Sequence, residues 1–207
     1  MWALVTDNTI TKIINKPKGL VIGDTRHSRN IFSFRWSNEE REAIGIYEVV
    51  FDNTNKKDEA YYNNTNQSFN FADGKVTASF GTATAKRLND EDAKDEDGNN
   101  VLDEDGNQVI NYGLKTEKKR IIKSQASGLL TPTDWYILKE ADAENYAIPS
   151  AITTYRVNVR ATSNEMEAKI NACTTVDELK TLYEYVNTGT EENRVMERPL
   201  GEFPKEI

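Results

Sequence analysis

The chain has one cysteine, one histidine and no long hydrophobic run, and each scarcity excludes a class of protein. A single cysteine, Cys173, cannot form a disulfide within the chain, so no disulfide framework supports the fold. The single histidine, His27, leaves no second imidazole for a histidine metal site and no patterned nucleophile for a Ser-His-Asp triad. No stretch approaches the roughly 18 apolar residues of a membrane-spanning helix. The sequence therefore predicts no catalytic residues, no metal site, no cofactor and no membrane insertion.

The net charge of −8 lies in one segment of the chain. Between residues 89 and 106, nine acids accompany a single base, Lys94, so this segment carries all of the −8 and the rest is neutral. Nucleic-acid binding needs lysines and arginines to neutralise phosphates, so the charge argues against that function. With 207 residues, 37% hydrophobic and 29% charged, the chain has the composition of one large globular domain or two small ones.

Residues 1–88 carry the pattern of a β-rich attachment domain with one short helix. Segments with the apolar runs or the alternation of strands are 2–5, 10–14, 20–22 and 30–36. Ser37 and Glu40 are spaced as a capping box, which predicts the short helix. The clearest strand is 46–51, rich in β-branched and aromatic residues, and a later hairpin turns at Asp73-Gly74.

Residues 89–112 contain an eight-residue repeat, DEDGNNVL at 95–102 and DEDGNQVI at 103–110. Each copy has an Asp-Gly dipeptide, which favours a tight turn and predicts a three-stranded meander, or a linker if the strands lack a partner. A calcium loop is the alternative, but the glycine and the bidentate acid do not stand where such a loop requires them. We expect the acids to fold back on the basic run 115–123, with docking on a second copy as the alternative.

Residues 113–190 carry helical patterns and form the predicted helical domain. Thr131 followed by Pro132 has the pattern of a helix start, and Asp134 stands where a capping-box acid would. Pro149 ends one element and begins the next.

A second capping box, Thr175 with Glu178, predicts a last helix that continues to Gly189. The tail, 191–207, has the pattern of an extended arm with two apolar residues, Leu200 and Phe203. The predicted class is α+β, with a β-rich N-terminal domain, an acidic hairpin or meander as an insert, and a helical C-terminal domain.

The most apolar part of the sequence, 128–160, holds the candidate functional residues. The ordinary interpretation is a helical hairpin with Trp135 and Tyr155 in its core. The alternative is an interface formed by Trp135, Tyr155, Arg156 and Arg160, because tryptophan, tyrosine and arginine are enriched at interaction hot spots. Either interpretation gives these residues a role in packing or contact rather than in chemistry.

Three stretches resemble small structural proteins encoded by tailed bacteriophages, especially marine ones: WALV with ITKIINKPKGLVIG, FSFRWSNEEREAIGIYEVV, and SGLLTPTDWYILKEAD with AIPSAITTYRVNVR. The YR-x-x-x-R ending is also similar to the C-terminal region of phage tail-fibre assembly proteins. The resemblance covers most of the chain outside the acidic repeat. It implies a non-enzymatic structural protein of the virion tail, a fibre or baseplate component involved in assembly or host attachment. It carries no catalytic residues to transfer to this chain.

The resemblance also implies partners and a location. The partners are other phage tail proteins, together with further copies of the chain in a homo-oligomer, for which a trimer is one expected state. The location is the virion tail, with the host cytoplasm during assembly, and the N-terminus lacks the pattern of a signal peptide. The alternative function is a tail-fibre assembly chaperone. A hydrolase of host glycans is a third hypothesis, but it needs two carboxylates at a defined separation in a cleft, whereas the acids here cluster in the repeat.

Overall fold

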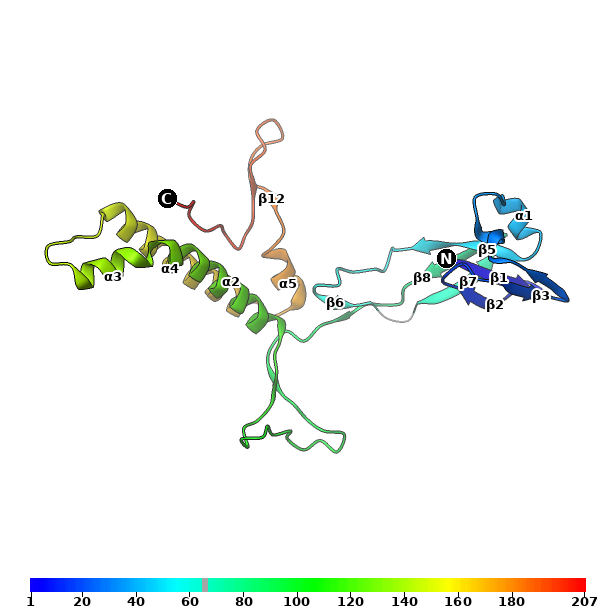
Figure 1. The fold of residues 1–207 in the computed structure, drawn as a ribbon, viewed down its shortest axis with the longest axis horizontal. Coiled ribbons are helices and arrows are strands. Elements are labelled where there is room, and N and C mark those ends of the chain that lie inside the picture. The colour runs from blue at the N-terminus through cyan, green and yellow to red at the C-terminus, as the bar shows by residue number, and fades with distance from the viewer. Residues whose placement is uncertain (65–66) are drawn as a thin grey trace. The chain divides into compact units, whose positions relative to one another are not determined.

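The structure, a computed structural model, describes residues 1–64 and 67–207 (Figure 1). The chain divides into two compact units, Met1–Thr84 and Ala85–Ile207, whereas the sequence pattern places the boundary at residue 88. The five-stranded sheet lies in the first unit and the three longest helices lie in the second, so the predicted α+β class is confirmed. Every helix in the described ranges is too short or too polar to cross a lipid bilayer.

A five-stranded mixed sheet organises the first unit, with the strand order β2-β1-β5-β8-β7. Its strands are β1 (Trp2–Thr6), β2 (Thr9–Ile14), β5 (Ile46–Asp52), β7 (Ser68–Ala72) and β8 (Lys75–Ser79). The predicted hairpins β1-β2 and β7-β8 are both present, and their turns have positive φ at Asp7, Asn8, Asp73 and Gly74. Two successive left-handed residues are what a type I′ hairpin turn requires. β5 joins the two hairpins, antiparallel to β1 and parallel to β8, a pairing that no local pattern predicts.

Smaller elements complete this part of the chain: β3 (Leu20–Ile22) paired with β4 (Thr25–His27), the predicted capped helix α1 (Asn38–Glu42), and β6 (Tyr62–Asn63) paired with β9 (Thr84–Ala85). The strand predicted over 30–36 is wrong, because a 3-10 helix, η1 (Arg29–Phe32), forms there. The Ser28 hydroxyl accepts a hydrogen bond from the Asn30 N–H at 3.3 Å, and the Ser33 hydroxyl donates to the Asn30 carbonyl at 2.7 Å. Such local side-chain bonds favour a turn over an extended strand.

Both faces of β1 are covered, because its alternate residues enter two different hydrophobic clusters. Ala3 and Val5 belong to a cluster completed by Val49, Val76 and Ala78. Trp2 and Leu4 pack against a second cluster, which consists of Ile14, Leu20, Ile31 and Ile46. The first unit therefore has a hydrophobic core of its own.

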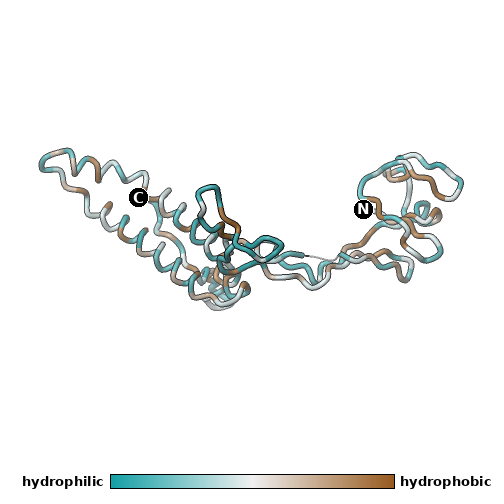
Figure 2. The backbone as a smooth tube through the Cα atoms, turned by 90° about the horizontal axis from the view of Figure 1, so that it is seen from below, coloured by the Kyte–Doolittle hydropathy of each residue, from teal (hydrophilic) through white to brown (hydrophobic). Residues whose placement is uncertain are grey.

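An antiparallel pair of helices, α2 (Leu114–Leu130) and α4 (Ser150–Ala172), organises the second unit (Figure 1). Figure 2 shows hydrophobic and hydrophilic residues recurring in turn along both helices. Their shared cluster consists of Ala126, Tyr155 and Val159, with Leu129, Leu130 and Phe203 packed against it. A helical hairpin is therefore present, but its first arm is α2 rather than the segment that begins at Thr131.

The helix start predicted at Thr131 is wrong, because the chain stays helical through this point. A 3-10 turn, η2 (Thr131–Thr133), links α2 to α3 (Asp134–Asp142). The Thr131 hydroxyl donates to the Ser127 carbonyl at 2.8 Å instead of capping a new helix. Pro132 lacks the N–H that an unbroken α-helix would use here, which accounts for the change of helical geometry.

The last helix, α5 (Val176–Thr181), begins at the predicted capping box but ends well before Gly189, so the predicted extent is wrong. The Leu182 carbonyl accepts a hydrogen bond from the Leu200 N–H at 2.9 Å. In a continuing helix that carbonyl would pair with the Val186 N–H. The chain instead forms a short ladder of β12 (Val186–Asn187) and β13 (Met196–Glu197).

The acidic repeat forms two similar loops between β10 (Glu91–Asp92) and β11 (Ile110–Asn111). Asp95 Oδ1 accepts hydrogen bonds of 3.0 and 2.8 Å from the N–H groups two and four residues later, and Asp103 Oδ1 does the same. Three backbone bonds of 2.8 to 3.0 Å then form a closed ring among Ala93, Val101 and Val109. The repeat is thus ordered by bonds within itself.

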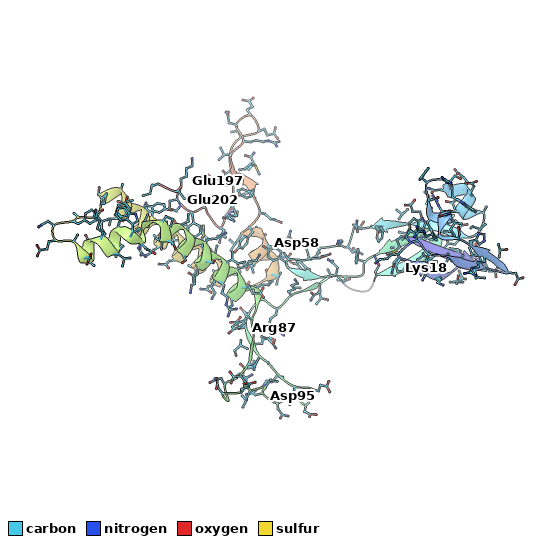
Figure 3. The ribbon with its side chains drawn as sticks, viewed as in Figure 1. Lys18, Asp58, Arg87, Asp95, Glu197 and Glu202 are labelled. Atoms are coloured by element: carbon cyan, nitrogen blue, oxygen red, sulfur yellow. The ribbon has the colours of Figure 1, made fainter. Side chains whose placement is uncertain are left out.

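The repeat does not fold back on the basic run of α2, so that expectation is wrong. Figures 1 and 3 show the loops, with Asp95 labelled, extending away from the helices of the second unit. The acid that reaches α2 is Asp90, which precedes the repeat and accepts hydrogen bonds of 2.8 Å from the Gly113 N–H and from the Thr116 hydroxyl. Within the loops, the carboxylates of Asp95 and Asp103 instead close their own turns.

Candidate functional site

The four candidate residues divide into two buried and two exposed side chains. Tyr155 and Arg156 are 5% and 6% exposed, whereas Trp135 is 50% exposed and Arg160 lies on the surface. The prediction of Trp135 as a core residue is therefore wrong, and that of Tyr155 is confirmed. Because half of the set is buried, the four side chains do not form one exposed surface.

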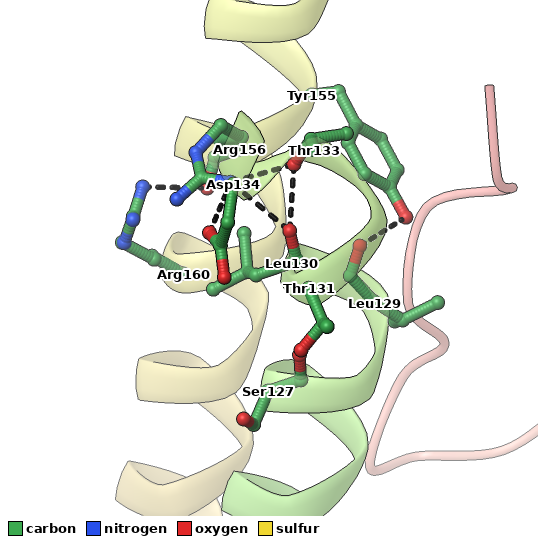
Figure 4. A network of polar contacts seen from close by, with 9 residues as sticks. All are labelled: Ser127, Leu129, Leu130, Thr131, Thr133, Asp134, Tyr155, Arg156 and Arg160. Carbon is green, nitrogen blue, oxygen red and sulfur yellow. Dashed lines mark hydrogen bonds and ion pairs between the residues drawn. The ribbon is translucent and has the colours of Figure 1, made fainter. Parts of the chain in front are cut away.

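Arg156 is the centre of a buried polar cluster (Figure 4). Its Nη1 lies 2.8 Å from Asp134 Oδ1, 3.0 Å from the Leu130 carbonyl oxygen and 2.6 Å from Thr133 Oγ1. Charge-assisted hydrogen bonds of this kind are stronger than neutral ones and orient a planar guanidinium closely. The cluster joins three successive elements, α2, η2 and α3, to α4.

Tyr155 binds the same end of α2 as Arg156, its neighbour in the sequence. Its hydroxyl donates to the Leu129 carbonyl at 3.4 Å, while Arg156 and the Thr133 hydroxyl both donate to the Leu130 carbonyl. The last carbonyls of a helix have no partner in the helix itself, and a buried carbonyl without a donor is costly. The Tyr-Arg pair therefore caps α2 at the point where Pro132 interrupts it.

Burial and a neighbouring charge both affect the Tyr155 hydroxyl. Its pKa is raised first by burial and then by the nearby carboxylate of Glu206. The phenol is thus held in its neutral form, which can still donate to the Leu129 carbonyl. Nothing in this environment prepares Tyr155 to give up its proton.

The most exposed apolar side chains of the second unit include those of α3, which buries none of its residues. Trp135 and Tyr136 have ring centroids 3.8 Å apart, and the Lys139 ammonium lies 5.7 Å from the Trp135 centroid. Leu138 is 70% exposed, and Ile137 is also exposed. Apolar side chains gathered on one short exposed helix are typical of a contact surface.

Cys173 and His27 are two further residues whose side-chain types can take part in catalysis or metal binding. The pKa of the Cys173 thiol is raised, first by burial and then by Glu178, so the nucleophilic thiolate is disfavoured. Cys173 borders an open hollow of about 540 Å³ between α4 and α5. His27 lies edge-on to Trp36, with ring centroids 6.5 Å apart. Within 1–64 and 67–207, no group of three histidine, cysteine or acidic side chains is placed to hold a metal ion.

Two carboxylates of the acidic loops, those of Asp95 and Asp103, are committed to their turns. The pKa values of Asp95 and Asp103 are lowered chiefly by backbone hydrogen bonds from Asn99 and Asn107. A carboxylate that already accepts two backbone N–H groups has fewer lone pairs left for a ligand. The hydrogen-bond geometry therefore explains Asp95 and Asp103 as residues that form turns.

Two residues of the helical unit have roles that the sequence pattern does not reveal. Asp134 has the spacing of a capping acid, yet it binds Arg156. Lys169 has no distinguishing signal, although its Nζ donates to the carbonyls of Pro199 and Leu200 at 2.8 and 3.1 Å. The position of Lys169 next to the apolar stripe of α4 is the one feature of the sequence that could have pointed to this role.

No protein-family model, curated protein or solved structure matches the chain.

Proposed function

We propose that the chain is a non-enzymatic structural component of a bacteriophage tail, part of the fibre or the baseplate, that takes part in assembly or host attachment. The observation that carries the proposal is the division into two units, each with its own hydrophobic core. Two separately cored units provide two attachment surfaces, which is what a joining component of a large assembly needs. The resemblance to structural proteins of tailed phages supplies the kind of assembly.

The buried polar cluster of the helical unit supports a non-enzymatic role. Arg156 and Thr133 are both buried, and their donors are directed to helix carbonyls and to Asp134. A catalytic group needs a donor or acceptor atom directed at a site where a substrate atom can lie. Here the donor atoms of Arg156 and Thr133 bind groups on neighbouring helices, so the cluster acts as a structural joint.

The exposed face of α3 is the surface through which the helical unit would contact a neighbouring tail protein. Trp135 and Leu138 are the large apolar side chains on it, and the buried joint at Arg156 holds the helix in place. Interfaces concentrate their binding energy in a few large side chains of this type.

Mass spectrometry of virions, purified from the phage that encodes the chain, tests the proposal. We expect the protein in a fixed ratio to fibre or baseplate proteins, and we expect antibody labelling at the tail in negative-stain images. A virion carrying Trp135→Ala and Leu138→Ala should lose the protein, whereas Ile121→Ala, at an exposed apolar position on α2, should not. Absence from virions and from unassembled fibres would contradict the proposal.

The alternative, a tail-fibre assembly chaperone, has a different signature in the same experiment. A chaperone would be missing from mature virions but would co-purify with unassembled fibre protein from infected cells. The similarity of the YR-x-x-x-R segment to fibre-assembly proteins is what favours this alternative. The structure gives that segment a packing role at the end of α2, which either function can use.

A further inference from the structure

The last ten residues of the chain, 198–207, are not a free arm but lie on the helical unit as a strap. Leu200 is 1% exposed, and Phe203 packs against the cluster of Ala126, Tyr155 and Val159. Figure 1 shows the C-terminal segment turning back toward the α2-α4 pair, and Figure 4 shows it passing beside Tyr155. The expectation of an extended tail is therefore corrected: Leu200 and Phe203, the two apolar residues named for it, are docked.

The polar contacts of the strap are made largely through its backbone. The Lys169 ammonium binds the carbonyls of Pro199 and Leu200, and the Leu200 N–H binds the Leu182 carbonyl. The strap also forms a turn of its own, because the Gly201 N–H donates to the Arg198 carbonyl at 2.8 Å. Main-chain bonds combined with two apolar anchors are the way in which many proteins recognise a short peptide.

The strap follows an exposed connector that contains the β12-β13 ladder, and its other end borders a hollow beside α4. The connector, residues 184–197, is exposed at every position. At the other end, a hollow of about 430 Å³ lies between α4 and the strap residues Pro204, Lys205 and Ile207. Fourteen residues from 184 to 197 reach about 45 Å when fully extended, so the connector is long enough to deliver the strap to a neighbouring molecule.

We propose that the strap is exchangeable, so that its docking surface on α2, α4 and Leu182 accepts the strap of a second copy of the chain and the exchange links the copies. The contacts of the strap with α2, α4 and Leu182 are preserved in such an exchange, whereas the connector changes its path and gives up the β12-β13 ladder and the hydrogen bond from the Tyr185 hydroxyl to Glu202. Exchange of an identical element is a low-cost route to an oligomer for this reason. The attached strap competes at a high effective concentration, so exchange is favoured at high protein concentration. The inference does not depend on a role in a phage tail.

A labelled peptide with the sequence of residues 198–207 tests whether the docking surface of the strap is a separable binding site. We expect it to bind the full chain carrying Leu200→Ala and Phe203→Ala at least tenfold more tightly than the wild type, whose own strap competes. Ile207→Ala, at an exposed position of the strap, should behave as the wild type. A peptide with the same two alanines should not bind. Equal affinities, or no binding to a double variant that is folded by circular dichroism, would overturn the proposal.

A second variant covers the case in which the double variant does not fold. Phe203→Ala alone removes one apolar anchor of the strap and leaves Lys169 and the rest of the surface that the peptide binds unchanged. It should raise the peptide affinity over that of the wild type by a smaller factor, and no increase would count against the proposal.

Exchange between copies is tested by size-exclusion chromatography with light scattering on the wild type. We expect a larger species that grows with protein concentration and that excess free peptide converts to monomer. A wild-type chain that stays monomeric at all concentrations, or an oligomer that the peptide leaves unchanged, would overturn the exchange.

Discussion

The guanidinium of Arg156 lies 2.8 Å from the carboxylate of Asp134, and this ion pair joins the start of α3 to the second turn of α4. The same nitrogen donates to the Leu130 carbonyl and to the Thr133 hydroxyl. One buried side chain thus holds the whole turn around Pro132, where the helical path changes from α to 3-10 and back. The kink is therefore stabilised by a partner that comes from another helix.

Arg156→Met should destabilise the helical unit by about 2 kcal/mol, because the buried Thr133 hydroxyl oxygen loses its donor and the Leu130 carbonyl loses one of its two donors. Asp134 is half exposed, so water can hydrate the carboxylate that remains. Urea unfolding followed by circular dichroism measures the change. Arg160→Met is the matched control, because Arg160 is exposed and lies one helical turn later, and it should cost about 0.5 kcal/mol or less. Equal losses for both variants would show that burial of the guanidinium is not what matters.

Trp135→Ala should change the free energy of unfolding by less than about 1 kcal/mol, because half of the indole is already in water. A fully buried tryptophan would cost about 3–5 kcal/mol. Ile122→Ala, at a position that is 1% exposed on α2, is the comparison and should cost about 2–5 kcal/mol. Denaturant titration of both variants decides the matter, and a larger loss at Trp135 than at Ile122 would place the indole in the core after all.

The sequence predicts well those elements whose signals lie within a few residues of each other. The capping box at Ser37 and the turns at Asp7-Asn8 and Asp73-Gly74 are of this kind, and all are found. Such motifs satisfy backbone groups with side chains from the same turn, so no distant partner can overrule them.

The incorrect predictions share the opposite property. Thr131-Pro132 suits a helix start as well as a 3-10 kink, and the choice depends on the distant Arg156. The predicted helix through Val186 ends early because Leu200, which is remote in sequence, takes the Leu182 carbonyl. In the candidate site, the sequence pattern identifies the Tyr-Arg pair but does not show that the pair is buried. The residues of a short helix such as α3, or of the first turns of α4, do not specify which face of the helix is covered by the rest of the protein.

Gly113→Ala should destabilise the second unit by about 1–3 kcal/mol, because a methyl group at this position would overlap backbone atoms. An ideal Cβ would lie 2.6 Å from the Leu88 carbonyl oxygen and would also meet the Asn89 carbonyl. Gly113 is the N-cap residue of α2, and Gly128→Ala inside that helix is the control, because a Cβ there meets nothing within 4 Å. It should stabilise the protein by about 0.5–1 kcal/mol through helix propensity. Thermal unfolding of the two variants should therefore shift in opposite directions, and shifts of the same sign would refute the steric argument.

Asp90 should make the stability of the helical unit depend on pH at the acidic end. Its pKa is lowered from 3.8, chiefly by the hydrogen bond from the Gly113 N–H and next by that from the Thr116 hydroxyl. Because the folded-state pKa lies below the unfolded one, the contribution is present above pH 3.8 and is lost as the pH falls through the lower folded value. Asp90→Asn should therefore be less stable than the wild type near neutral pH.

The difference between Asp90→Asn and the wild type should disappear as the pH falls below 3.8, and urea titrations across the acid range measure it. Thr116→Val removes one of the two donors to the Asp90 carboxylate. It should reduce, without abolishing, the pH-dependent part of the free energy of unfolding. A difference between Asp90→Asn and the wild type that stays constant down to about pH 2 would mean that the charge of Asp90 contributes nothing to the cap.

Replacing residues 93–109 by Asn-Gly should leave both units folded, because the hydrogen bonds of the acidic loops close on themselves. Asp92 and Ile110 are already paired across β10 and β11, and Asn-Gly is the dipeptide that closes a two-residue hairpin. We expect the melting temperature to change by no more than about 2 °C. A larger fall would show that the loops contribute to the stability of the helical unit through contacts beyond β10 and β11.

The same replacement removes six acids and Lys94, so the net charge changes from −8 to −3 (−8 minus −5). The loops extend away from the basic run of α2, so a basic surface of another molecule is a partner that their charge fits. If that molecule is a second copy, the oligomer formed by the loop-deleted chain should be weaker than that of the wild type, and more so at low salt, where screening is small. Size-exclusion chromatography with light scattering at two salt concentrations measures this. An oligomer that is unchanged at both concentrations would mean that the loops take no part in self-association. The strap would then be the remaining link between copies, and the peptide competition experiment would test it separately.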